Sequence, residues 1–179
     1  DLRVATGLLD IRFIAGNSDL VAAVRADSLD YWRKDAKRNL PELEKTLSER
    51  HERAGELAYL LEPDLKEARG GLRDIQALRS ISLSGAVQVP LEKISWAEST
   101  LNNVREALHT ASGRGKDRLL FQEQDKVAKI LDYKNADAMM SDVARAARTV
   151  DYLLDYTWHA LEHKGKDGLG RIMRRPRVV

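Results

Sequence analysis

The sequence predicts an all-α fold, a helical bundle. Apolar residues recur at helical spacings over most of the 179 residues. Extended patterns are confined to Tyr59-Leu60-Leu61 and to residues 87–90, which are too few and too short for a sheet. A hydrophobic content of 43% in a chain of this length is enough for one ordinary domain with its own core.

The first two helices are expected near the amino terminus. Thr6 is a possible cap for a short helix that ends at Gly16, and Asn17 or Ser18 suits the N-cap of the next helix. The apolar residues of that second helix are predicted to form its inner face: Leu20, Val21, Val24 and Trp32.

Three helices are expected in the middle of the chain. Pro41 suits the first turn of a helix that runs to about Leu57. A second helix follows the paired glycines at 70 and 71 and runs to about Ser84, with apolar residues three positions apart. The third starts at about Leu91 or Ser95 and ends before the glycine at 113.

The last two helices have clear amphipathic patterns. One covers residues 122–131, and a longer one runs from Ala136 to about His163. Asn135 is a plausible cap for the long helix and Gly165 a plausible stop. We therefore expect a helical domain over residues 1–163 and a basic, glycine-rich linker or tail over residues 164–179.

The net charge of +2 hides this division of the chain. Residues 164–179 carry six basic side chains and one acid, so the tail is at +5 and the preceding residues sum to −3. A solvated linker is the expected role of such a tail. No aromatic residue stands among its charges, which disfavours nucleic acid as a partner.

Composition also restricts the compartment and the chemistry. The chain has no cysteine, which excludes disulfides, thiolate nucleophiles and cysteine-type zinc sites. No apolar run approaches the roughly 18–20 residues of a membrane span. We expect a cytoplasmic protein with no membrane partner, and the start at Asp1 suggests a piece of a longer polypeptide. No metal site is expected, since the helical pair His159 and His163 lacks an evident third ligand.

Residues 62–75 hold the densest set of candidate binding residues. Gly70 and Gly71 permit close approach of an anion to the first amides of the following helix, and Lys66 and Arg73 add positive charge. A structural interpretation stands beside this one. The glycines then only permit a tight turn, Asp74 favours the positive helix start, and the two cations pair with nearby acids.

A second basic cluster follows later in the chain. Arg105 and His109 share a helix face at a spacing of four residues, and a glycine-containing loop brings further cations close to them. A solvated basic face and a phosphate contact are the two interpretations. The full cluster is Arg105, His109, Arg114, Lys116, Arg118 and Lys126, with Gln124 between the last two.

The residue patterns of three segments resemble those of a known family. Leu61-Glu62-Pro63-Asp64-Leu65-Lys66 followed by Gly70-Gly71-Leu72-Arg73-Asp74-Ile75 is similar to the hallmark of the PII-protein uridylyltransferase and uridylyl-removing enzymes, bacterial sensors of nitrogen status. Residues 2–16 and 118–128 resemble further segments of that family. The resemblance covers roughly residues 1–163. One departure is that Ala68 and Arg69 stand where the family usually carries a Gly-Pro pair.

The resemblance implies a role for the chain. In this family of polymerase-beta-like nucleotidyltransferases, a helical substrate-binding domain follows the catalytic sheet and faces it across a cleft. By the resemblance, the parent enzyme would use magnesium and either UTP or ATP to transfer a nucleotide to a tyrosine of the PII signalling protein. By this resemblance Lys66 and Arg73 contact phosphate or PII, and Gly70 and Gly71 offer their amides. Arg118 and Gln124 also match the family pattern.

The chain lacks the family's catalytic motifs. It has no Gly-Ser dipeptide, and none of its sixteen aspartates is followed two residues later by Asp or Glu. None of its four histidines precedes an aspartate, as the hydrolase motif requires. The fragment is therefore expected to be inactive without the catalytic and hydrolase domains of the same polypeptide. The alternative is a non-catalytic helical domain for protein interaction or scaffolding.

Overall fold

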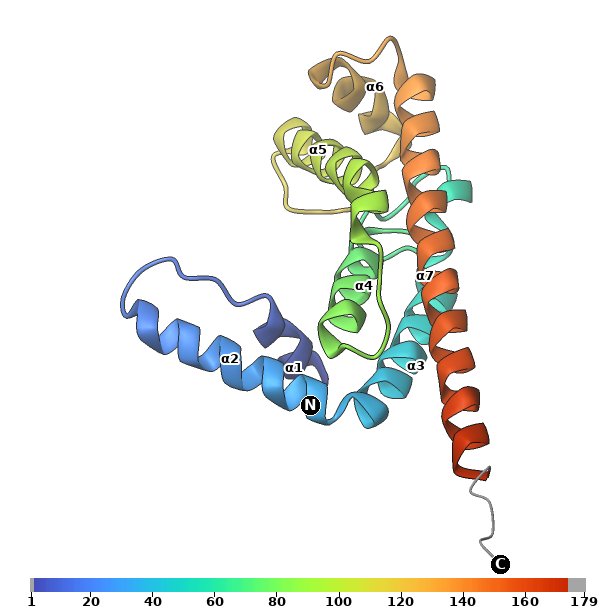
Figure 1. The fold of residues 1–179 in the computed structure, drawn as a ribbon. Helices are drawn as coiled ribbons and strands as arrows, with labels where there is room; N and C mark the ends of the chain where they lie inside the picture. The colour runs from blue at the N-terminus through green and yellow to red at the C-terminus, as the bar shows by residue number, and fades with distance from the viewer. Residues whose placement is uncertain (1, 174–179) are drawn as a thin grey trace, which may run out of the picture.

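The structure, a computed structural model, describes residues 2–173. These residues form seven α-helices and two short 3-10 helices, and they contain no strand, which confirms the predicted all-α class (Figure 1). No helix in this range is long and apolar enough to cross a membrane.

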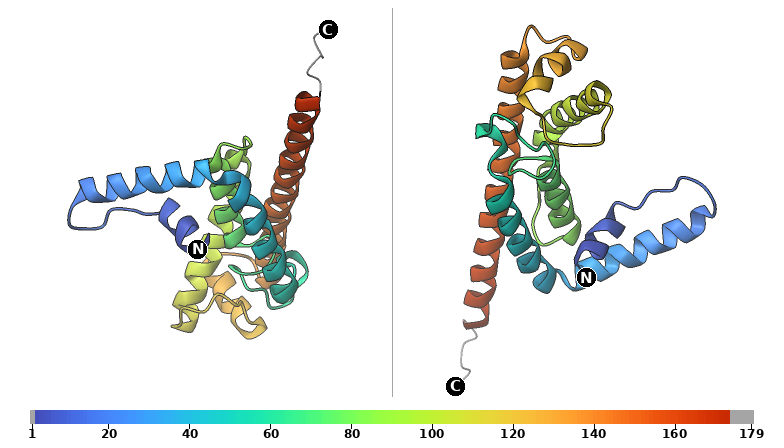
Figure 2. Two further views of the ribbon diagram at one scale, coloured as in Figure 1. Left: turned by 90° about the horizontal axis from the view of Figure 1, so that it is seen from below. Right: turned by 180° about the vertical axis from the view of Figure 1, so that it is seen from behind.

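The long helix α7 (Ala136–Met173) is the axis of the fold. Figures 1 and 2 show it as a rod along one side of the molecule. The helices α4 (Leu72–Ser84), α5 (Ser95–Ser112) and α6 (Phe121–Ile130) pack on it. The 3-10 helices η1 and η2 also pack on it, at 57–59 and 91–94. The core therefore lies between α7 and the middle of the chain.

The helices α1 (Leu2–Leu9) and α2 (Ser18–Lys34) form an arm that projects from the other helices (Figures 1 and 2). One end of α2 is anchored by Trp32, which is fully buried and donates its indole hydrogen bond to the Ser80 carbonyl of α4 at 2.8 Å. The next helix, α3 (Ala36–Ala54), contacts α1, α2 and α4.

Several predicted boundaries are confirmed. Asn17 caps α2, since its side-chain oxygen accepts from two amides of the first turn at 2.9 and 3.1 Å. The helix α4 starts directly after Gly71 and ends at Gly85, which adopts the left-handed conformation. Asn135 accepts from the Ala138 amide at 2.9 Å at the start of α7.

Other predictions are wrong in the amino-terminal half. Thr6 lies inside α1 and donates back to the Leu2 carbonyl at 3.0 Å, as helical threonines do, instead of capping. α1 ends at Leu9 and not at Gly16, because Phe13 and Ile14 are exposed and no packing supports a longer helix.

Two positions on α2 and α3 also differ from the prediction. Leu20 is exposed, since it lies on the projecting part of α2 and not on an inner face. Pro41 is inside α3 because that helix already begins at Ala36. The two leucines that follow Pro41 in the pattern, Leu43 and Leu47, are buried as expected.

The long helix runs past its predicted stop. α7 continues beyond Gly165 to Met173, so the first part of the predicted linker is helical. A glycine inside a helix costs only about 1 kcal/mol relative to alanine, which does not end a helix by itself. The rest of the basic tail, residues 174–179, lies outside the described residues.

Gly70 sets the distance between the segment that precedes α4 and the axis of the fold. Its φ is +83°, and a Cβ atom built on it would lie 2.6 Å from the Ala147 carbonyl oxygen of α7. Gly85 has a similar φ of +73° but open space around it. Of these two glycines, Gly70 alone combines a positive φ with a close approach to another backbone, and both require glycine.

The comparison of these two glycines gives a test of the packing. Gly70→Ala is expected to lower the free energy of unfolding by about 2–5 kcal/mol, because left-handed strain and a backbone clash add together. Gly85→Ala is expected to cost about 1–2 kcal/mol, since it has the strain alone. Urea unfolding of both variants measures the difference, and equal losses would contradict the close approach.

Candidate functional site

The predicted binding stretch forms a loop, residues 60–71, between η1 and α4, which we call the glycine loop. Backbone hydrogen bonds hold it on two sides. On one side the Leu57 amide donates to the Arg69 carbonyl at 3.0 Å, and the Arg69 amide donates to the Gly55 carbonyl at 2.9 Å. On the other, the Leu65 amide donates to the Asp117 carbonyl at 2.9 Å. The loop is therefore an integral part of the fold.

A buried carboxylate closes the glycine loop. Asp74 is completely buried in the first turn of α4. Its Oδ2 accepts from the Gly70 amide at 2.7 Å, and its Oδ1 accepts from Arg50 of α3 and lies 2.9 Å from His51 Nε2. These contacts join the loop, α3 and α4, so Asp74 holds three parts of the fold together.

The first amides of α4 are already bonded within the loop. The Gly71 amide donates to the Ala68 carbonyl at 2.9 Å, the Leu72 amide to Leu65 at 3.0 Å, and the Arg73 amide to Lys66 at 3.1 Å. The interpretation of these glycines as donors open to an anion is therefore wrong. Their lack of side chains instead permits close packing, since a Cβ on Gly71 would lie 2.7 Å from the Ala68 carbonyl oxygen.

Lys66 and Arg73 remain partly exposed at the surface of the loop. The Arg73 Nε donates to Glu67 Oε1 at 2.7 Å, with 43% and 38% of the two side chains exposed. The Lys66 Nζ is 4.0 Å from Asp117 Oδ2, the loosest ion pair of the site. Arg73 therefore has a partner that water screens, and Lys66 is held only at long range, so both pairs exchange at little cost.

Asp117 joins the second predicted cluster to the glycine loop. Its Oδ1 accepts from Arg105 Nε at 2.6 Å and lies 2.9 Å from His109 Nε2, while its other oxygen faces Lys66. The sequence analysis did not single out Asp117. The available signal was that it is the lone acid among the cations of residues 114–118.

Arg118 and Gln124 hold the start of the loop. Arg118 is 3.5 Å from Glu62 Oε2 and keeps 64% of its side chain exposed. Gln124 is buried in α6 and donates to the Leu61 carbonyl at 2.7 Å. The structure thus places Gln124 in the packing of the loop, whereas Arg118 is open at the surface.

Arg69, which departs from the family pattern, fixes the loop to α7. Its Nε donates to Asp151 at 2.5 Å, and a second guanidinium nitrogen lies 2.9 Å from Asp155. The hydrogen bond to Asp151 is the main cause that raises the pKa of Arg69. These ion pairs restrain the loop at the position where the family usually has the ring of a proline.

Burial and charge act in opposite directions on Asp117. Burial raises the pKa of its carboxyl group, but the hydrogen bonds from Arg105 and His109 and the charges of Arg105 and Lys66 outweigh it. The net effect is a pKa below the ordinary value.

The described residues contain no group of three or more histidine or acidic side chains that could hold a metal ion.

This lowered pKa predicts an acid-sensitive contribution to stability. The contribution of Asp117 is complete above the pKa of about 3.9 that the carboxyl has in the unfolded chain, and it is lost as pH falls through the lower pKa of the folded state. Wild type should melt above Asp117→Asn at pH 6, and the gap should close below about pH 4. A gap in melting temperature that stays constant down to pH 2 would contradict this account.

The chain is similar to known proteins over almost its whole length. The family model described as GlnD PII-uridylyltransferase matches residues 38–84 and 89–158. A bifunctional uridylyltransferase/uridylyl-removing enzyme of Streptomyces coelicolor is 47% identical over 182 residues, which cover 99% of this chain and 21% of the relative. The enzyme of the same description from Mycobacterium tuberculosis H37Rv is 33% identical over 186 residues, with 99% and 23% covered.

The chain spans about a fifth of the length of the curated relatives that it matches. No solved structure matches it. The family match includes all of α4 and α5 and both segments that flank the glycine loop, and it confirms the resemblance seen in the sequence. The chain belongs to the GlnD PII-uridylyltransferase family.

Proposed function

We propose that this chain is the helical substrate-binding part of a PII-protein uridylyltransferase and is inactive by itself. The parent enzyme would transfer UMP, or AMP, from a nucleoside triphosphate to a tyrosine of a PII protein. The single observation that carries the proposal is the family match, which spans the glycine loop and most of the helices that hold it. The catalytic and hydrolase domains of the same polypeptide are the other partners in this proposal.

The geometry of the loop suits a binding role. Lys66 stands on the glycine loop and Arg73 in the first turn of α4, and backbone bonds and a buried carboxylate hold these two segments in place. A binding site whose frame is fixed before the ligand arrives loses less conformational entropy on binding. The weak existing partners of the two cations leave them able to bind phosphate oxygens, for which charge-assisted hydrogen bonds are strong.

The chemistry of the transfer defines what such cations do. The tyrosine hydroxyl would give its proton to a base in the rest of the polypeptide, its oxygen would attack the α-phosphorus, and the bond to the bridging oxygen would break, so that pyrophosphate leaves with the negative charge. Lys66 and Arg73 would hold the phosphates in position and stabilise that charge. The described residues do not provide a magnesium site, so the proposal assigns the metal and the catalytic carboxylates to the rest of the polypeptide.

A second candidate is a non-catalytic interaction or scaffold domain. It is favoured by the number of predicted site residues that are engaged inside the fold. The Gly70 amide donates to Asp74 and the Gly71 amide to the Ala68 carbonyl, Gln124 is buried, and Arg105 and His109 share Asp117. This candidate predicts no affinity for nucleotides at the glycine loop.

Titration of the ¹⁵N-labelled chain separates the two candidates. UTP, ATP and a PII protein are added in turn with magnesium, and backbone shifts are expected at Lys66 and Arg73 with at least one of them. Lys66→Glu should weaken that binding tenfold or more, because a charged hydrogen bond is worth about 1.5–3 kcal/mol.

The matched control is Lys45→Glu, a reversal of an exposed cation on α3 whose pair with Glu49 is long, at 3.9 Å. It should leave the affinity unchanged. If millimolar ligands move no amide of the loop, or if Lys66→Glu lowers the melting temperature without a change in affinity, the substrate-binding role is refuted for this chain.

A further inference from the structure

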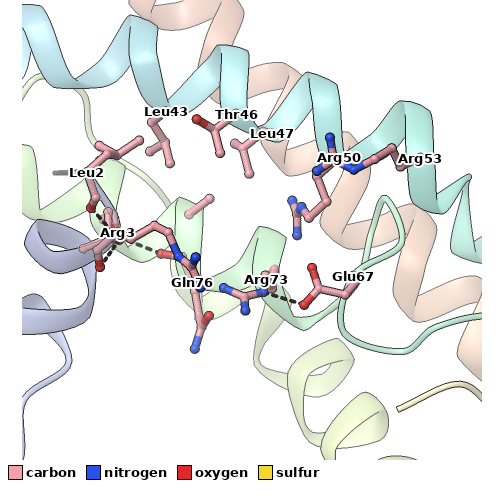
Figure 3. A pocket seen from close by; sticks show the side chains of 13 residues that line it. Leu2, Arg3, Leu43, Thr46, Leu47, Arg50, Arg53, Glu67, Arg73 and Gln76 are labelled. Atoms are coloured by element: carbon pink, nitrogen blue, oxygen red, sulfur yellow. Dashed lines mark hydrogen bonds and ion pairs between the residues drawn. The ribbon is translucent and has the colours of Figure 1, made fainter. Parts of the chain in front are cut away.

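A cavity of about 380 Å³ lies between α1, α3 and α4, beside the glycine loop (Figure 3). Leucines of α1 and α3 and an alanine of α4 form its apolar walls, and Thr46, Gln76 and Ser80 add polar groups. A volume of this size is in the range of small-molecule sites. Nothing in the family resemblance or in the sequence motifs pointed to this cavity.

The charges that line the cavity are strongly one-sided. Four arginines from three elements line it, against the single acid Glu67 of the glycine loop. Among these cations Arg3, Arg53 and Arg73 are exposed at the rim, and Arg50 is buried. The lining contains no lysine, and a planar guanidinium suits the two-point binding of oxyanions.

Arg50 provides an independent sign of an anion site. Its side chain is 9% exposed, and only one of its terminal nitrogens, Nη2, donates to Asp74. The other, Nη1, is buried and has no hydrogen-bond partner within the described part of the chain. A buried charged donor without an acceptor is rare in folded proteins and calls for an explanation.

Two other arginines of the cavity, Arg53 and Arg73, are available or weakly held. Arg53, one turn after Arg50 on α3, has no ion pair with any residue of the described range. Arg73 is held only by Glu67, across an exposed pair of 2.7 Å that Figure 3 shows at the mouth of the cavity. Glu67 thus supplies the only negative charge that the lining offers to these cations.

We propose that this cavity is an anion site that binds a phosphoryl group, with Arg50, Arg53 and Arg73 as its donors. With Glu67 in the lining and Asp74 beside Arg50 counted against the four arginines, the surplus of positive charge is +2, which matches a phosphate of charge near −2. An incoming phosphate would take Arg73 from Glu67 and offer acceptors to Arg53 and, after a small side-chain shift, to Nη1 of Arg50. The site deepens the proposed function and rests on it only for the nature of the natural ligand.

Glu67 connects this site to the glycine loop. Its amide donates to Asp64 Oδ1 at 2.8 Å in the same turn that holds Lys66. A bound phosphate that releases the Glu67 carboxylate would therefore also affect the glycine loop. The acid acts as a competitor for Arg73, and its removal should favour the ligand.

The test is calorimetric titration of the chain with pyrophosphate, with inorganic phosphate and with UTP or ATP. Arg53→Ala is expected to weaken pyrophosphate binding tenfold or more. Glu67→Gln is expected to strengthen it two- to tenfold, an increase that a merely structural residue would not give. Arg79→Ala is the matched control, because Arg79 is also on α4 but pairs with Glu98 away from the cavity; its affinity should equal that of wild type.

Two results would overturn the site: no pyrophosphate binding at millimolar concentration, or an unchanged affinity for pyrophosphate in both Arg53→Ala and Glu67→Gln. Succinate that binds as tightly as pyrophosphate would overturn the assignment to phosphate. The arms also distinguish free phosphate from a nucleotide as the source. Pyrophosphate binding with no response to nucleotides or PII supports the cavity and refutes the proposed function, whereas nucleotide shifts at Lys66 that persist without a pyrophosphate site do the reverse.

Discussion

The buried carboxylate of Asp74 is the constraint on which the rest of the site depends. A carboxylate without contact to water is tolerated only when charged or polar donors surround it. Here the donors come from two sources: the Arg50 and His51 side chains of α3 and the Gly70 backbone amide of the glycine loop. One side chain therefore determines how α3, α4 and the loop meet.

The packing of the loop on α7 follows from the same arrangement. With Gly70 held by Asp74, its backbone approaches the Ala147 carbonyl so closely that no side chain fits between them. Arg69, the preceding residue, then reaches Asp151 and Asp155 on the same face of α7. Asp74 of α4 and the contacts with α7 therefore fix the glycine loop. Lys66 on the loop and Arg73 next to it stand on a rigid support.

The same contacts explain which parts of the fold could be predicted. The boundaries of α4 and the start of α7 depend on local signals, namely glycines, an asparagine cap and apolar periodicity, and these signals were correct. The predictions for Thr6 and Leu20 were wrong because both residues lie on the projecting arm, where few tertiary contacts support a local pattern. The end of α7 was misplaced because a glycine weakens a helix without ending it.

The site was only partly predictable for a related reason. Lys66 and Arg73 are part of the motif and could be found from the sequence. Arg50 and Asp74 are 24 positions apart, and no local pattern shows that one neutralises the other. The cavity is harder still to predict from the sequence. Its arginines come from α1, α3 and α4, and in the sequence each of them alone looks like an ordinary surface charge.

Hydrogen exchange of the Gly70 amide tests the central role of Asp74 most directly. Asp74→Asn leaves Arg50 buried without its counter-charge, a loss of about 3–5 kcal/mol in comparable buried pairs. We expect the amides of residues 70–73 to exchange at least a hundredfold faster in that variant, with a smaller change in the α5 and α7 cores. Glu98→Gln, which breaks the exposed pair with Arg79, should change little. Loop amides in Asp74→Asn that stay as protected as in wild type would contradict the account.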